Sequence, residues 1–157
     1  MYKKVLVPLD GSKLAECALN HVKKIFQDGT AGEVVLLGAV VVDIPWREFN
    51  AGEGMPREAF DLNAFVKVFL DKSTRYLENV QSRLASEGIK ARTEAIESNR
   101  PASTITDYAH KNGFDLIVMA THGYTGMKGM MLGSVALKVL HESHVPVLLI
   151  RPDACQI

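Results

Sequence analysis

The sequence has few cysteines and no long apolar segment. Its two cysteines, Cys17 and Cys155, lie near opposite ends of the 157 residues, which is too few and too scattered for a disulfide framework or a zinc site. No stretch supplies the roughly 18 apolar residues that a membrane helix needs. Met1 is followed almost at once by two lysines and an apolar run, so no signal peptide is predicted. We therefore expect a cytoplasmic protein with no membrane partner.

An excess of charge and the common catalytic motifs are also missing. Eighteen basic residues balance eighteen acidic ones, so no global field attracts nucleic acid. The chain has no Gly-x4-Gly-Lys-Ser/Thr loop, no Gly-x-Ser-x-Gly elbow and no His/Glu zinc helix. We therefore predict no nucleic-acid partner, no metal ligands and no catalytic residues. Fast turnover of a substrate is not expected.

What the sequence does contain is a regular alternation of apolar runs and helical patterns. Composition fits a globular domain, with 47% apolar and 23% charged residues. Strand-like runs cover residues 3–9, 34–42, 89–97, 116–120 and 145–150, and helical spacing of apolar residues fills 14–26, 66–84, 101–111 and 135–143.

This β-α alternation predicts an α/β fold: a doubly wound five-stranded parallel sheet, of strand order 3-2-1-4-5, with helices on both faces. We expect a single domain over residues 1–152 and a loose tail over 153–157. Residues 43–63 break the pattern and are interpreted as an irregular excursion, either a lid over the strand ends or a surface loop.

The segment from Asp115 to Ser134 predicts a site for an anion. A buried strand, 116–120, runs into a loop with four glycines, and a helix begins near Ser134. Glycines permit close approach of the backbone to a ligand. The first amides of a helix have no internal partners and favour negative charge. A phosphate group is the expected guest.

A second segment is predicted to meet that loop. Pro8 should end the first strand, and Asp10 follows directly. In a doubly wound sheet the first and fourth strands are neighbours, and ligands sit where the winding reverses, beyond the carboxyl ends of the strands. Asp10 and Ala120 should therefore face each other across one crevice.

These motifs resemble the universal stress protein family over nearly the whole chain. The ending Val7-Pro8-Leu9-Asp10-Gly11-Ser12 is similar to the family's first strand, and Val145-Pro146-Val147-Leu148-Leu149-Ile150 to its last. The family's nucleotide pattern, Gly-x2-Gly-x9-Gly-Ser/Thr, matches at Gly123, Gly133 and Ser134. Its first glycine is replaced here by Ala120.

The resemblance implies the adenine nucleotide alpha hydrolase-like fold and a homodimeric regulatory protein of the stress response. Its cofactor would be ATP or a related adenine nucleotide, with or without Mg²⁺. The implied nucleotide-binding residues are Pro8, Leu9, Asp10, Ala39, Met119, Ala120, Gly123, Gly133, Ser134 and Val135. Asp10 would lie near the ribose hydroxyls, and Ser134 is also expected to cap the fourth helix.

The last strand predicts the dimer independently. Residues 147–150 are apolar and would form a sheet edge, which natural proteins cover. A two-fold partner pairing the segment Val145 to Ile150 is an economical cover. Two other functions stay open: a dimeric interaction module that binds no nucleotide, favoured by Ala120, and a slow ATPase that uses His122 and Lys128.

Overall fold

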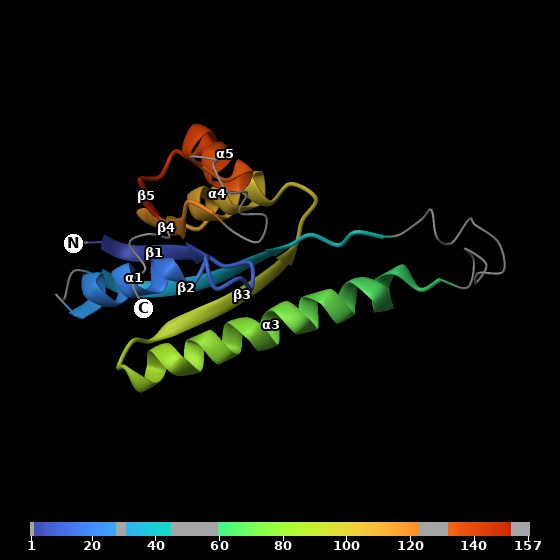
Figure 1. The fold of residues 1–157 in the computed structure, drawn as a ribbon, viewed down its shortest axis with the longest axis horizontal. Coiled ribbons are helices and arrows are strands. Elements are labelled where there is room, and N and C mark those ends of the chain that lie inside the picture. The colour runs from blue at the N-terminus through green and yellow to red at the C-terminus, as the bar shows by residue number, and fades with distance from the viewer. Residues whose placement is uncertain (1, 28–30, 45–59, 123–131, 152–157) are drawn as a thin grey trace.

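The computed structural model describes residues 2–27, 31–44, 60–122 and 132–151 (Figure 1). Its centre is a five-stranded sheet in the order β3-β2-β1-β4-β5, and every neighbouring pair is parallel. This confirms the predicted strand order. The strands are β1 (Tyr2–Pro8), β2 (Ala31–Val40), β3 (Ala91–Glu97), β4 (Leu116–Ala120) and β5 (Val147–Ile150).

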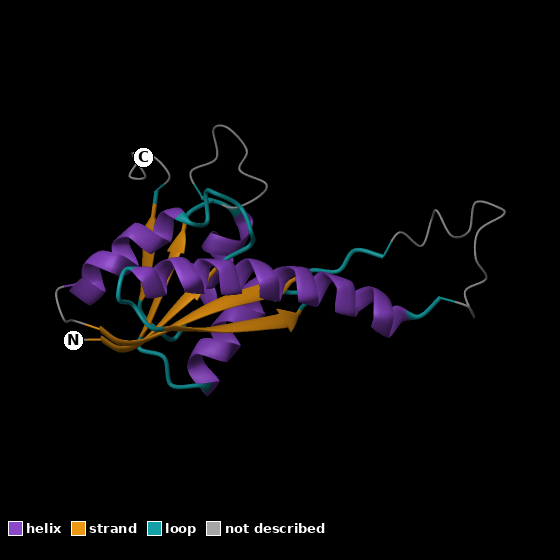
Figure 2. Cartoon of the chain, turned by 90° about the horizontal axis from the view of Figure 1, so that it is seen from below, coloured by secondary structure: helices purple, strands orange, loops and turns teal. Residues whose placement is uncertain are grey.

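Helices cover both faces of the sheet, so that each face has its own apolar core (Figure 2). Side chains of α1 (Cys17–Gln27) and α3 (Leu62–Ser86) pack on one face. Side chains of α4 (Pro101–Lys111) and α5 (Ser134–Glu142) pack on the other. Burial on two faces explains why β1 and β4 read as continuous apolar runs rather than as alternating ones.

Local chemistry explains most element ends. Pro8 is the last residue of β1. Gly88 and Gly113, which follow α3 and α4, have φ values of 82° and 66° that few other residues tolerate. The first helix begins three residues later than predicted, at Cys17 rather than Leu14. The reason is a tight turn: the amides of Cys17 and Ala18 bond to carbonyls only three residues back.

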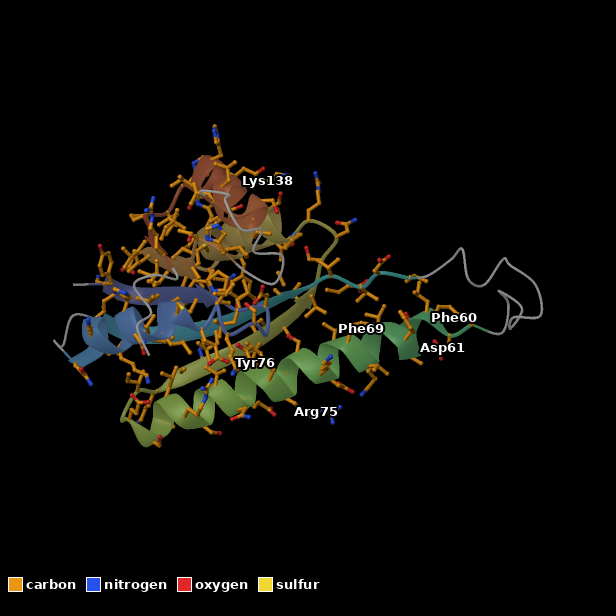
Figure 3. The ribbon with its side chains drawn as sticks, in the orientation of Figure 1. Phe60, Asp61, Phe69, Arg75, Tyr76 and Lys138 are labelled. Atoms are coloured by element: carbon orange, nitrogen blue, oxygen red, sulfur yellow. The ribbon has the colours of Figure 1, made fainter. Side chains whose placement is uncertain are left out.

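Helix α3 is longer than the sheet strand beside it, and its two halves differ in burial. Leu77, Val80 and Leu84 in its second half are fully buried, but no residue of its first half is. In that first half, the Phe65 ring packs against Phe69 at 5.1 Å between centroids, and Phe60 packs against Phe65 at 5.3 Å. Figure 3 shows this end of α3 extending away from the sheet.

Part of the sequence interpretation falls outside the described residues. Most of the 43–63 excursion does, as do Gly123, Lys128 and the 153–157 tail. The last two residues of the predicted excursion, Leu62 and Asn63, belong instead to α3. Among the residues that are described, no helix combines the length and the apolar character needed to cross a membrane.

Candidate functional site

One cavity of about 370 Å³ opens at the carboxyl edge of the sheet, where β1 and β4 are neighbours. Its walls come from the ends of β1, β2 and β4 and from the amino-terminal turns of α4 and α5. This is the edge at which the winding of the sheet reverses, and ligands of doubly wound folds bind there.

The structure brings the predicted site residues together, with one residue outside the described part. Gly123 lies outside the described residues. All the others line the cavity: Pro8, Leu9, Asp10, Ala39, Met119, Ala120, Gly133, Ser134 and Val135.

Asp10 lies at the rim of the cavity, in a turn that is stabilised by hydrogen bonds to its own side chain. Its Oδ1 accepts hydrogen bonds from the amide of Ser12 at 2.9 Å and from the Ser12 hydroxyl at 2.6 Å. The Ser12 Oγ in turn accepts from the amide of Ala15 at 3.1 Å. An aspartate that bonds two residues ahead forms a tight local turn. The turn fixes the carboxylate in place at the mouth of the cavity.

The start of α5 differs from the prediction. Gly133, not Ser134, is the capping residue, and Ser134 is the first residue of the helix. The cause is a close contact: the Gly133 amide donates to the Thr121 carbonyl at 2.7 Å, and a Cβ at Gly133 would lie 2.9 Å from that oxygen. Only glycine lets the backbone approach so closely. Contact with the Thr121 carbonyl, directly after β4, thus accounts for this glycine without any ligand.

Ala120 occupies the last position of β4 in ordinary strand conformation, opposite Ile150 of β5. It is buried in the core on the α1 side and also lines the cavity. Among the described glycines, positive φ occurs at Gly11, Gly88 and Gly113, and none of these is in β4. Alanine therefore fits this backbone without strain.

The interior of the cavity is mainly apolar. Leu37, Ala39 and Val41 come from β2 and the residue after it, Met119 from β4 and Ile105 from α4. Sequence reasoning named Ala39 and Met119 but missed the other three. The two-residue period of a strand places positions 37, 39 and 41 on one face, and that signal was available. Ile105 depends on how α4 packs.

His122 and Thr121 form the polar end of the site. The Thr121 Oγ1 and His122 Nδ1 atoms are 2.9 Å apart, and Thr121 is buried. The Thr121 amide donates to the carbonyl of Ile150, which holds this end of β4 against β5. Within the described ranges, no three His, Cys, Asp or Glu residues gather in a way that would hold a metal ion.

A half-buried phenol lies close to the Asp10 turn. Tyr76 of α3 donates its hydroxyl to Glu16 Oε1 at 3.0 Å. Burial raises the pKa of Tyr76 above its ordinary value, and the carboxylates of Glu16 and Asp10 raise it further. Figure 3 shows Tyr76 on the side of α3 that faces the sheet. The tyrosine therefore stays protonated and acts as a hydrogen-bond donor.

Fold and cavity together define an α/β protein of the adenine nucleotide alpha hydrolase-like fold, with its candidate site at the switch point of the sheet. The chain belongs to the universal stress protein family, whose model matches residues 1–151.

Three relatives match over almost their whole length. Universal stress protein MJ0577 of Methanocaldococcus jannaschii is 34% identical over 96% of both chains, and its solved structure superposes with a TM-score of 0.78. Universal stress protein YxiE of Bacillus subtilis is 30% identical over 96% of this chain and 100% of its own. UspA of Lactobacillus plantarum, 22% identical, covers 96% and 98% of the two chains and has the same fold with a TM-score of 0.75.

Proposed function

We propose that the protein binds ATP or a related adenine nucleotide in this cavity and acts as a cytoplasmic regulatory protein of the stress response. The observation that carries the proposal is the composition of the cavity. One space contains an apolar slot, a fixed carboxylate at its rim and the amino-terminal end of a helix. Adenine, ribose and phosphate are the chemical complements of those three parts.

The apolar slot suits a purine base. A volume of about 370 Å³ lies within the usual range for small-ligand sites. The pairing of β1 with β2 ends at Pro8 and Leu37, with one further bond from the Leu9 amide to the Leu37 carbonyl. Backbone groups of alternate strand residues point the same way, so the amide and carbonyl of Ala39 point past the end of β1. They can read the polar edge of a base.

The rim suits ribose and phosphate. A carboxylate accepts hydrogen bonds from sugar hydroxyls, and Asp10 presents one in a fixed turn. Ser134, Val135 and Ala136 form the first turn of α5 and line the cavity, and the first helical bond runs from the Leu137 amide to Gly133. Their amides lie at the positive end of the helix, where phosphate binds.

Proteins of the same fold support the choice of nucleotide. One universal stress protein was solved in complex with cAMP; it is 18% identical to this chain and has a TM-score of 0.58. Another, from Arabidopsis thaliana, was solved with AMP bound at 15% identity and a TM-score of 0.53. Two proteins of this fold thus hold adenine nucleotides although they differ from this chain at most positions. This supports the same class of ligand here.

Calorimetric titration tests the proposal. We expect ATP, with or without Mg²⁺, to bind the wild-type protein, and Asp10→Ala to weaken binding by about tenfold, as expected when a hydrogen bond to a charged group is lost. Asp107→Ala is the matched control, because Asp107 is exposed on α4 and does not line the cavity. No heat and no thermal shift at millimolar ATP, ADP, AMP and cAMP would exclude the proposal.

The two rival functions have their own tests. A nucleotide-free interaction module predicts that the purified native protein carries no adenine nucleotide, which mass spectrometry of the denatured sample reveals. A slow ATPase is favoured by His122, which lines the cavity. If hydrolysis is seen, a rate unchanged by His122→Ala and Lys128→Ala would remove those residues from the chemistry.

We also propose a homodimer through the segment Val145 to Ile150. β5 lies at the end of the strand order and has β4 as its one neighbour within the described sheet. Leu148 on this strand is 38% exposed. The other edge strand, β3, carries the charged residues Arg92, Glu94 and Glu97, which discourage pairing with another chain. The apolar edge is thus the one that needs a cover.

A further inference from the structure

A cluster of three side chains joins α3 to the turn that begins at Asp10. The Tyr76 hydroxyl donates to Glu16 Oε1 at 3.0 Å, and Arg83 Nη2 donates to Glu16 Oε2 at 2.7 Å. Tyr76 and Arg83 are seven residues apart, so they lie on one face of the helix. Figure 3 shows Tyr76 on that face, while Arg75 points away from the sheet. Each carboxylate oxygen of Glu16 therefore has a donor from α3.

The backbone of Glu16 belongs to the Asp10 turn. Its amide donates to the Ser12 carbonyl at 3.4 Å, and the amide and hydroxyl of Ser12 both donate to Asp10 Oδ1. A chain of hydrogen bonds therefore runs from Tyr76 through Glu16 and Ser12 to Asp10. The Glu16 side chain is only 24% exposed, so solvent does not fully screen these contacts.

We infer that Glu16, held by Tyr76 and Arg83, is a positioning residue that aims the Asp10 carboxylate at the ribose of the bound nucleotide. The inference rests on the proposed function. Glu16 and Tyr76 do not line the cavity, so they act through the turn rather than on the ligand. Of the two donors, Tyr76 contributes more, because the Arg83 side chain is 54% exposed and its ion pair is weakened by water.

The consequence is a selectivity that depends on residues outside the cavity. The Asp10 carboxylate can accept hydrogen bonds only from a sugar that carries hydroxyls. The protein should therefore bind ATP more tightly than 2′,3′-dideoxy-ATP. Removing a hydrogen bond to a charged group usually changes affinity by about tenfold. If the turn loses its anchor on α3, part of that preference should disappear while the affinity for dideoxy-ATP stays the same.

The experiment measures, by calorimetry, the dissociation constant of 2′,3′-dideoxy-ATP divided by that of ATP. A high value of this ratio means a strong preference for the sugar with hydroxyls. The test variants are Glu16→Gln, which leaves one oxygen for two donors, and Tyr76→Phe, which removes a single hydroxyl. The control is Glu87→Gln, because Glu87, the C-cap of α3, forms another ion pair with α1, through Lys23 at 2.6 Å, and neither of these residues lines the cavity. We expect both test variants to lower the ratio about threefold or more, and the control to leave it unchanged.

A double variant separates positioning from general damage. Because Glu16 acts through Asp10, adding Glu16→Gln to Asp10→Ala should lower the ratio no further. A wild-type ratio in both test variants, or an equal weakening of both nucleotides, overturns the inference and leaves the proposed function standing. If the wild-type protein binds neither nucleotide, the proposed function fails and the inference with it.

Discussion

At the scale of single residues, Asp10 and Gly133 shape the rim of the cavity, while apolar side chains line its interior. Both residues were identified from the sequence, because a polar residue directly after a buried strand and a glycine directly before a helix mark loop positions at the carboxyl edge of the sheet. Val41 and Ile105 were not identified: the two-residue period of β2 could have placed Val41 beside Ala39, whereas the position of Ile105 depends on how α4 packs. The capping role given to Ser134 was wrong by one position, since the Thr121 carbonyl demands a glycine at that place.

Ala120 gives a prediction about the family motif. Because this residue keeps strand geometry in β4, the glycine of the family pattern is not required for its backbone. We expect Ala120→Gly to change ATP affinity by no more than about threefold and to lower the free energy of unfolding by about 1 kcal/mol. Calorimetry and urea denaturation measure the two effects. A gain in affinity of tenfold or more would show that the methyl group obstructs the ligand.

Tyr76 gives a prediction about alkaline stability. Burial raises its pKa in the folded protein, whereas in the unfolded chain the phenol ionises near its usual pKa of about 10. Above that pH the unfolded state loses this proton and the folded state keeps it, so the free energy of unfolding falls as pH rises. The contribution of Tyr76 is complete below about pH 10.

The variant Tyr76→Phe should therefore lose less stability than wild type between about pH 9.5 and 11.5, as measured by urea denaturation at each pH. Tyr2→Phe is the control, since Tyr2 is 39% exposed. Parallel curves for wild type and Tyr76→Phe would contradict the pKa shift.

At the scale of elements, periodicity predicted each helix and strand now described, and tertiary contacts set their ends. The helix pattern counted Leu14, but the turn organised by Asp10 and Ser12 delays α1 to Cys17. Sequence spacing predicted α3, yet the close packing of α3 on β2 was not foreseeable, because it depends on one glycine. A Cβ added at Gly38 would lie 2.5 Å from the Ser73 hydroxyl oxygen.

The contact between β2 and α3 can be tested by a double-mutant cycle. Gly38→Ala should lower the free energy of unfolding by about 1–2 kcal/mol, the usual cost of overpacking. Ser73→Ala removes the hydroxyl that the new methyl meets, so the double variant should recover most of that loss. Chemical denaturation measures all three variants. Additive effects would mean that the strain at Gly38 does not come from Ser73.

At the scale of the whole molecule, the strand order followed from rules of chain topology. Right-handed crossovers on a parallel sheet, with a reversal between the first and fourth strands, leave few alternatives. The proposed homodimer is harder to infer from the sequence, because a single chain reveals an apolar edge strand but not what pairs with it. For most of residues 43–63 the sequence predicted no regular element, since apolar residues there follow neither the helical nor the strand periodicity.

The proposed homodimer gives the prediction at this scale. Leu148→Lys puts a charge on the open edge of β5, and we expect it to shift the protein from dimer to monomer at micromolar concentration. Leu62→Lys is the control, because Leu62 is 43% exposed on α3, the helix that packs beside β2 and β3. Sedimentation equilibrium distinguishes the states. A wild-type monomer, or a dimer unaffected by Leu148→Lys, would exclude this interface.

The pairing of β1 with β4 has a consequence for how the protein is made. The amides of Lys3 and Lys4 bond to the carboxylate of Asp115, and Lys4 lies 111 residues from that partner. During synthesis, β1 can pair with β4 only after most of the chain has been made and β4 has left the ribosome. Closing so long a loop is a slow step in folding. A nascent or truncated chain that ends before β4 therefore lacks Met119, Ala120 and the first turn of α5, and with them one side of the cavity.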